Sequence, residues 1–189
     1  MVEWIRLGIN YKAPDMYADE KLLVRKTGRG IYATIDRTGA YTNQVIFIFT
    51  LKKDRPTLYK QLRLGYVLGV LNSRMMFYKY YKALGDIEWK SFPYMIQDTI
   101  MSLPIRTIDF SDARQVYLHQ HIADKVDAVI ASGSPPDKAN DDEIERLVRE
   151  LYAVNTPASN ARIDSELERI GRLGSLLGSS AEKSEAEEE

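Results

Sequence analysis

The chain has 189 residues, enough for one domain with a hydrophobic core and a helical appendage. With 44% hydrophobic and 28% charged residues, its composition is that of a soluble globular protein. The longest apolar run, residues 64–71, is far shorter than the roughly 20 residues that cross a bilayer, so we expect no membrane-spanning segment. Because the chain has no cysteine, it has neither disulfides nor thiolate metal ligands. No basic region followed by an apolar signal core opens the chain, and we expect a cytoplasmic protein.

The charges are distributed unevenly between the two halves of the chain. Residues 1–107 contain 17 Lys and Arg against 9 Asp and Glu, a balance of +8. Residues 108–189 contain 9 against 18, a balance of −9. We interpret this as a basic front that binds a polyanion and an acidic rear that faces solvent or a partner. The alternative is chance variation of surface charge, inflated by the terminal run EKSEAEEE.

Four stretches of the front half have the alternation or the apolar run of a β-strand. They are residues 5–9, 21–26, 31–36 and 41–51. Gly28 and Gly30 mark a bend between the second and the third. From Val45 onward the fourth stretch is apolar on both faces, which is typical of a central strand covered on both sides. We therefore predict a small, mostly antiparallel sheet with one well-buried strand.

The apolar residues of 57–84 recur with the period of a helix. We predict one helix of about seven turns that packs on the sheet. Gly65 and Gly69 lie four residues apart on this helix, where missing side chains allow close packing on the sheet. Residues 85–107, which contain two prolines, predict irregular chain with short extended pieces.

The rear half predicts helices separated by a linker. Ser111 is a suitable N-cap for a helix that ends near Ala131, and residues 132–141 have the composition of a mobile linker. Further helices are predicted over residues 141–152 and 162–173, and we expect about the last dozen residues to be disordered. The fold class is α/β of the α+β kind, a small sheet packed by a long helix with a C-terminal helical extension. The predicted division is residues 1–107, 108–155 and 156–189.

Catalytic, metal and nucleotide patterns do not fit this sequence. His119 and His121 are two residues apart, and on a helix their side chains point about 200° apart, so we expect exposed histidines and no metal pair. The glycines at 28–30 lack the lysine and hydroxyl of a phosphate-binding loop. Ser134 to Asp137 is similar to a turn of amino-methyltransferases, but Asp137 lacks the aromatic ring that stacks on the extruded base. We expect no catalytic residues, no metal and no cofactor.

The order of several segments resembles a known family. The segments, within about residues 22–105, are KLLVRKTGRGIYATID, YTNQVIFIF, LGYVLGVLNSRMMFYKYY and a stretch with SFP and SLPI. In this order they resemble the C-terminal specificity domain, or target-recognition domain, of TaqI-like adenine methyltransferases and the related fused restriction-modification enzymes. The Leu-Asn-Ser step at 71–73 and the pair of Pro104 and Ile105 are the most distinctive pieces. DEIERLVRELYAV is similar to the family's usual continuation.

The resemblance implies a function in DNA recognition. In that family the domain grips duplex DNA opposite a methyltransferase domain and reads the recognition sequence, while the catalytic domain carries the methyl donor and the extruded adenine. The family's cofactor and base-flipping motifs lie upstream of the similar region, so we expect a module that is non-catalytic alone. Its expected partners are duplex DNA and a methyltransferase or restriction subunit. A separate or truncated specificity module and an excised domain both fit this expectation.

On this expectation, the cationic bend between the second and third predicted strands becomes the candidate DNA face. Glycines let the backbone turn and approach a ligand, a guanidinium pairs with two acceptors of guanine, and Asn or Gln pairs with adenine. The predicted DNA contacts are Arg25, Lys26, Thr27, Arg29 and Arg37, a second polar group of Thr42, Asn43 and Gln44, and Arg74 and Lys90. The alternative is a solvated hairpin tip, with long cationic stems lying on apolar surface. Asn72 and Ser73 are expected to serve local packing or a strand contact.

Two other functions stay open. One is a protein-interaction module that docks a partner through the acidic helices of its C-terminal half. The other is an enzyme whose site the sequence does not reveal. The DNA sequence recognised is beyond the reach of these patterns. The amphipathic helices at 111–131 and 141–152 can pack on each other or on a second copy of the chain, which leaves the oligomeric state open as well.

Overall fold

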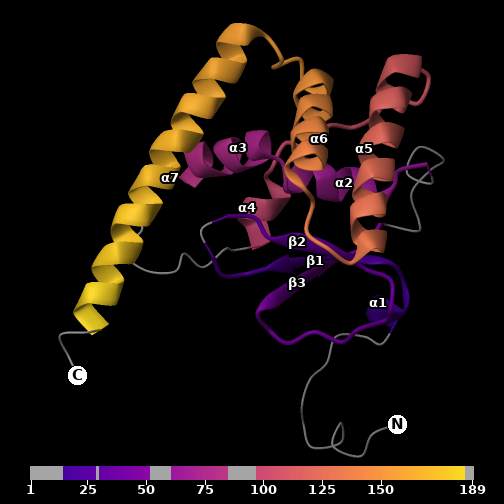
Figure 1. The fold of residues 1–189 in the computed structure, drawn as a ribbon. Coiled ribbons are helices and arrows are strands. Elements are labelled where there is room, and N and C mark those ends of the chain that lie inside the picture. Colours follow the sequence, from indigo (N-terminus) through magenta and orange to yellow (C-terminus); the bar gives the residue numbers. More distant parts are fainter. Residues whose placement is uncertain (1–14, 29, 52–60, 85–96, 186–189) are drawn as a thin grey trace, which may run out of the picture.

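The computed structural model of the chain describes residues 15–28, 30–51, 61–84 and 97–185 (Figure 1). These residues form an α+β fold, as the sequence predicts. In chain order the elements are α1 (Asp15–Ala18), β1 (Lys21–Arg25), β2 (Ala33–Asp36), β3 (Ile46–Phe49), α2 (Leu64–Leu71), α3 (Arg74–Leu84), α4 (Gln97–Met101), α5 (Ala113–Ser132), α6 (Lys138–Leu151) and α7 (Pro157–Glu185). β1 and β2 confirm two predicted strands, whereas the strand predicted at residues 5–9 lies outside the described residues. α4 falls within the stretch that was predicted to be irregular.

β1 is the central strand of the described sheet, which is antiparallel and has the order β2-β1-β3. Leu22 of β1 lies opposite Ile35 of β2 and Phe49 of β3, and all three side chains pack in or against the core. Among the described residues β3 pairs with β1 alone and lies at an edge, whereas we predicted a central strand at residues 41–51. Its apolar pattern reflects cover on both faces, since neighbouring Ile48 is also buried.

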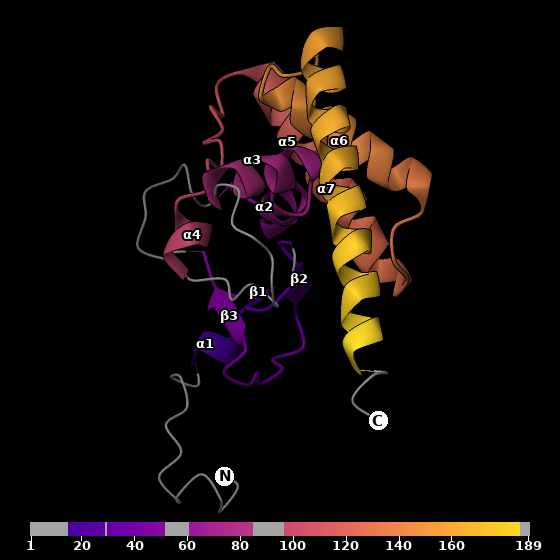
Figure 2. The same ribbon diagram turned by 90° about the vertical axis from the view of Figure 1, so that its left-hand side faces the viewer.

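α2 lies between the sheet and the other large helices. In both views α2, α5 and α6 lie on one side of the sheet and α1 on the other (Figures 1 and 2). A Cβ at Gly69 would lie 2.6 Å from Cγ2 of Ile122, and a Cβ at Gly65 would lie 3.0 Å from the carbonyl oxygen of Ala123. The two glycines therefore allow close packing against α5, and the prediction that they face the sheet is wrong.

The helix predicted over residues 57–84 is two helices, α2 and α3, which meet at Asn72 and Ser73. Asn72 binds the edge of β2, because its Oδ1 accepts from the N–H of Ala33 (3.2 Å) and its Nδ2 donates to the C=O of Ala33 (2.9 Å). Ser73 Oγ accepts from the N–H of Met76 (3.1 Å) and so caps α3. These contacts confirm the strand and packing roles predicted for the two residues. The start of the predicted helix lies outside the described residues.

The helices of the rear half begin or end at other residues than predicted. The N-cap of α5 is Asp112, whose carboxylate accepts from two N–H groups of the first turn, while Ser111 bonds to Asp109 instead. Asp137 caps α6, so this helix starts inside the predicted linker. α7 continues to Glu185 and takes in most of the residues for which we predicted disorder. α5 and α6 pack against each other, one of the two arrangements left open above.

Candidate functional site

The turn between β1 and β2 and the residues before β3 lie at the same end of the sheet. Both strand pairs are antiparallel, so the end of β1 meets the start of each neighbour. The N–H of Arg25 donates to the C=O of Tyr32, and the N–H of Lys26 donates to the C=O of Val45, both at 2.9 Å. We call the described residues 25–28, 30–32 and 42–46 the turn end of the sheet.

Arg25 and Lys26 are the described cations of the turn end. Arg25 is exposed, and its Nε donates to Oγ1 of half-buried Thr27 (3.3 Å). Lys26 is half-buried, with Nζ 4.6 Å from the centre of the Phe47 ring. In the part of the chain that the structure describes, neither cation is paired with a carboxylate. Both charges are therefore free to meet an anionic ligand.

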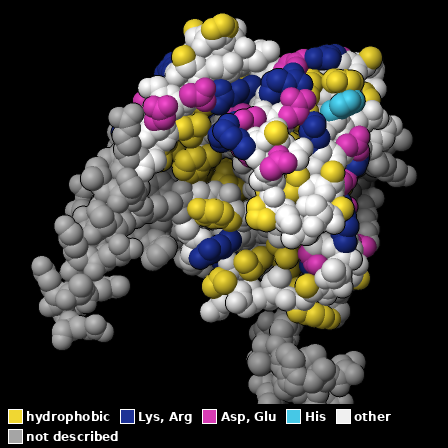
Figure 3. Space-filling view, in the orientation of Figure 1, with side chains coloured by type: hydrophobic (Ala, Val, Ile, Leu, Met, Phe, Trp, Pro, Cys, Tyr) yellow, Lys and Arg dark blue, Asp and Glu magenta, His cyan; other side chains and the backbone are white. Residues whose placement is uncertain are grey.

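The sheet and the helices also differ in how charged side chains are distributed on their surfaces. Over the helices, basic and acidic side chains alternate closely, whereas over the sheet a basic group is surrounded by apolar side chains (Figure 3). Isolated positive charge beside apolar surface suits a ligand that is both anionic and aromatic.

Tyr32 is a residue of the turn end that the sequence interpretation missed. Its side chain is 54% exposed, although it lies next to a buried strand. The ring lies against the backbone of Gly28, where a Cβ would be 2.8 Å from ring carbon Cε2. Gly28 has a φ of +131°, which glycine adopts readily and other residues rarely do. The signal in the sequence is an aromatic residue at an outward position directly after a glycine bend.

The second polar group is also at the turn end, but its three members differ. Asn43 shapes the entry to β3, since its Oδ1 accepts from the N–H of Val45 (3.2 Å) and its C=O accepts from the N–H of Ile46 (3.4 Å). Thr42 is half-buried and Gln44 is exposed. Asn43 and Gln44 are both exposed, but the Asn43 side chain is engaged within the turn, so the amide of Gln44 is the better placed to meet a ligand.

Arg37 lies at the opposite end of the sheet. It follows Asp36, whose partner in the strand register is Lys21 at the start of β1. Its guanidinium forms ion pairs with Asp127 and Glu20, each at 2.6 Å. Hydrogen bonds to these two carboxylates raise the pKa of Arg37. The structure thus separates Arg37 from Arg25 and Lys26, with which the sequence grouped it.

Arg74 is also separated from the turn end. It begins α3, and its Nη2 lies 2.8 Å from Oδ1 of Asp142 on α6. The other two predicted contacts, Arg29 and Lys90, lie outside the described residues.

Ion pairs between the two halves account for part of the uneven charge distribution. Arg63, just before α2, pairs with Asp124 (2.5 Å) and Asp127 (2.6 Å) of α5, and Lys82 of α3 pairs with Glu166 of α7 (2.8 Å). Burial alone raises the pKa of Asp127, but hydrogen bonds from Arg37 and Arg63 lower it overall below the usual value. The basic front and the acidic rear are therefore, in part, partners within one fold, which corrects our interpretation of the whole front as a polyanion surface.

His119 is buried, contrary to the prediction, while His121 is exposed. The Nε2 of His119 accepts from the N–H of Arg63 (3.2 Å), and the rings of Tyr66 and Phe110 lie 5.0 and 5.4 Å from its ring centre. Its Nδ1 is buried without a hydrogen-bond partner among the described residues. Burial lowers the pKa of His119, so the ring is neutral at pH 7.

Two further findings concern the described residues as a whole. Within them, no group of three His, Asp or Glu side chains is placed to hold a metal ion. None of their helices combines the length and the apolar character needed to cross a membrane.

Comparison with known proteins identifies the front half of the chain. Residues 2–105, more than half of the 189 residues, match the family described as the TaqI-like C-terminal specificity domain. The match confirms the resemblance drawn from the sequence, and it includes the whole turn end and the Asn72–Ser73 step. It ends before α5. No curated protein matches the chain.

Proposed function

This chain belongs to the family of TaqI-like C-terminal specificity domains, and on that premise we propose that it recognises a specific sequence of duplex DNA. It acts as the specificity module of a restriction-modification or DNA methyltransferase system. It is non-catalytic alone and works with a methyltransferase or restriction subunit in the cytoplasm, where the DNA of such systems is found.

The turn end of the sheet is the observation that carries this proposal. Arg25 and Lys26 lie beside the exposed ring of Tyr32 and the exposed amide of Gln44, and no described carboxylate neutralises the two cations. DNA offers anionic phosphates together with the edges and faces of aromatic bases. The chemistry of the turn end is complementary to both.

Each side chain of the turn end has its own part in the proposal. The guanidinium of Arg25 can pair with two acceptors of guanine and the amide of Gln44 with adenine, at about 1–3 kcal/mol of discrimination for a good bidentate contact. Lys26 binds a phosphate, which adds affinity without sequence choice. Thr27 orients Arg25 through the hydrogen bond to its Nε. Arg37 and Arg74 hold the fold together through their ion pairs, so we assign the DNA contacts to the turn end.

The rival proposal, a protein-interaction module, depends on acidic charge that is free to meet a partner. On α5 and α6, the described carboxylates of Asp124, Asp127, Asp142 and Glu145 bind arginines of this same chain. That pairing favours DNA recognition over docking through the acidic helices.

A salt titration with matched variants tests the proposal. Binding of the full chain to a labelled random-sequence duplex is followed by fluorescence anisotropy over a range of salt concentrations. The logarithm of the binding constant is expected to fall linearly with that of the salt concentration, with a slope of about −0.9 for each phosphate neutralised. The double variant Arg25→Ala with Lys26→Ala should reduce the slope by about one such contact, that of Lys26, and the loss of Arg25 should weaken binding further.

The control removes two exposed cations from helices, as Lys79→Ala with Arg162→Ala. It should leave the slope close to that of the unchanged protein. If the two double variants lower the slope equally, the turn end is not the DNA face.

A further inference from the structure

Glu145 of α6 binds the start of another helix, α3. Its carboxylate, only 5% exposed, accepts from the backbone N–H of Arg74 (2.8 Å) and of Met75 (3.1 Å). The next N–H, that of Met76, donates to Ser73 Oγ. The first N–H groups of a helix have no partner within the helix and need acceptors from elsewhere. Glu145 therefore supplies from α6 the cap that fixes where α3 begins.

Glu145 is itself held by α7 through Arg149. The Nε of Arg149 donates to Glu145 Oε1 (2.6 Å), and the side chain of Arg149 is only 7% exposed. Its Nη1 donates to Asn160 (3.0 Å) and its Nη2 to Asp164 (2.6 Å), both on α7. A buried arginine that is itself held at two other nitrogens fixes the carboxylate through this charge-assisted hydrogen bond. The position of the α3 start is thus set by two helices that lie outside the family match.

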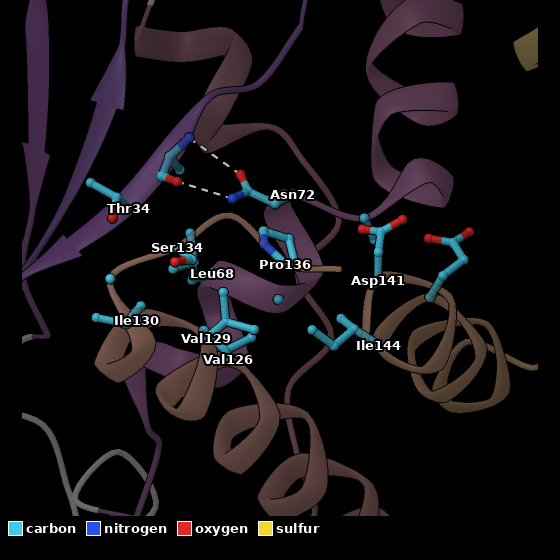
Figure 4. A pocket seen from close by; sticks show the side chains of 15 residues that line it. Thr34, Leu68, Asn72, Val126, Val129, Ile130, Ser134, Pro136, Asp141 and Ile144 are labelled. Carbon is cyan, nitrogen blue, oxygen red and sulfur yellow. Dashed lines mark hydrogen bonds between the residues drawn. The ribbon is translucent and has the colours of Figure 1, made fainter. Parts of the chain in front are cut away.

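The α2–α3 junction contacts the first residue of β2, and the first turn of α3 contacts the turn end. Asn72, the residue where α2 ends, holds Ala33 by two hydrogen bonds, drawn as dashed lines in Figure 4. Phe77, in the first turn of α3, lies against Gly30, where a Cβ would be 3.4 Å from its ring. Gly30 and Ala33 flank the exposed Tyr32, so these two contacts lie directly against the turn that carries Arg25, Lys26 and Tyr32.

Direct packing of α6 on β2 does not provide this link. A cavity of about 360 Å³ lies between them, with Thr34 of β2 on one wall and Ile144 and Asp141 of α6 on the other (Figure 4). Glu145 and the α2–α3 junction connect the C-terminal helices with the turn end instead.

We propose that Glu145 is a positioning residue for DNA recognition, through which α6 and α7 set the position of the β1–β2 turn. The consequence for DNA rests on the proposed function, but the positioning itself does not. On this proposal α6 and α7 contribute to DNA recognition without contacting the DNA, because they hold the β1–β2 turn of the matched domain in position.

Amide hydrogen exchange of the full chain, measured by NMR, tests the positioning directly. The amide of Ala33 donates to Asn72 and reports the junction, while amides of the β1–β3 ladder report global opening. The readout is the exchange rate of the Ala33 amide divided by that of the ladder amides. In Glu145→Gln this ratio should rise on the order of five- to tenfold, because the hydrogen bonds that join Glu145 to the start of α3 are weakened. Asp164→Asn, a change at a 56% exposed side chain that leaves the core intact, should raise the same ratio by less.

The matched control is Asp137→Ala, which removes the N-cap of α6 without touching α3. Its ratio should equal that of the unchanged protein. An unchanged ratio in Glu145→Gln, or the same rise in all three variants, overturns the proposal, because the effect would then be absent or would follow from global stability alone.

The consequence for recognition is read from the ratio of affinities for a preferred and a scrambled duplex. Glu145→Gln should reduce this ratio on the order of tenfold, whereas Asp137→Ala should preserve it. A faster Ala33 exchange with an unchanged ratio overturns the role in recognition. If the unchanged protein itself shows no sequence preference, the proposed function fails, and exchange at Ala33 still decides whether Glu145 positions the turn.

Discussion

The substitution Lys21→Met removes the cation of a buried ion pair at the end of the sheet opposite the turn end. The side chain of Lys21 is fully buried, and its Nζ donates to the carboxylate of Asp36 and to the C=O of Tyr17. Removing one partner of a buried pair costs about 3–5 kcal/mol. Asp36 keeps hydrogen bonds from the side chain and N–H of Thr38 and from the N–H of Ala40, so we expect the lower end, a loss of about 3 kcal/mol in the free energy of unfolding.

The same pair makes stability depend on pH. The hydrogen bond from Lys21, followed by those from Thr38, lowers the pKa of Asp36 well below its usual value. The ionised carboxylate therefore stabilises the fold above the unfolded-state pKa of about 3.9, and this contribution is lost as the pH falls through the lower, folded-state pKa. In Lys21→Met the loss of stability below about pH 4 should be shallower than in the unchanged protein, because less of the shift remains.

Urea unfolding followed by far-UV circular dichroism, at pH 7 and at a series of lower pH values, measures both effects. Arg25→Met is the matched control, since it removes a cation from the exposed end of the same strand and should change the free energy of unfolding by no more than about 0.5 kcal/mol. A loss below about 1 kcal/mol for Lys21→Met, or an unchanged acid profile, would refute the reasoning.

Three further predictions follow from the site and the core. Gln44→Ala should relax the DNA preference at adenine positions without changing the salt slope, which sequencing of selected duplexes together with anisotropy would reveal. Because burial lowers the pKa of His119, stability is full above pH 6.5 and falls below it, by up to about 1.4 kcal/mol per pH unit; unfolding between pH 7 and 5.5 should show this slope, and His119→Gln should lack it. Gly69→Ala should cost about 1–3 kcal/mol in thermal unfolding, because the new methyl would lie 2.6 Å from a buried isoleucine methyl on α5. Gly171→Ala, whose methyl would meet no described residue within 4 Å beyond its own helix turn, should be neutral or stabilising in the same assay.

Local patterns predicted those elements whose formation depends on neighbours in the sequence. The alternation of residues 21–26 and 31–36 predicts β1 and β2, and the glycines between them predict the turn. The face of α5 with Leu118, Ile122 and Val126 is buried as its period indicates. Turn chemistry and periodicity act within a few residues, so the sequence alone is enough to identify them.

The break between α2 and α3 could not be found in this way. Asn72 and Ser73 occur in a run whose apolar period continues through them. What ends α2 is the pairing of Asn72 with Ala33, 39 positions earlier, and the cap that Glu145 provides to Arg74 from 71 positions later. These two contacts depend on the completed fold, and the local signal at the break is Ser73, which caps α3.

Only part of the candidate site could be predicted, because long-range contacts also decide which of its cations are paired. The register of β1 with both neighbours brings residues 42–46 to the turn that carries Arg25 and Lys26, whereas Arg37 of the first predicted group lies at the opposite end. Arg37 looked like a free cation in the sequence because its partner Asp127 is 90 positions away. Net charge over a half-chain counts such residues as available when the fold has already paired them.

The central claim is that this chain reads a DNA sequence through the turn end, and selection from a random pool tests it most directly. The full chain is incubated with randomised duplex DNA at two salt concentrations, and the bound fraction is sequenced. We predict that one short motif is enriched, that affinity falls steeply as salt rises, and that Arg25→Ala weakens the enrichment. Salt-sensitive binding without enrichment would contradict sequence recognition by the chain on its own, and no binding at either salt concentration would contradict the assignment of the turn end to DNA.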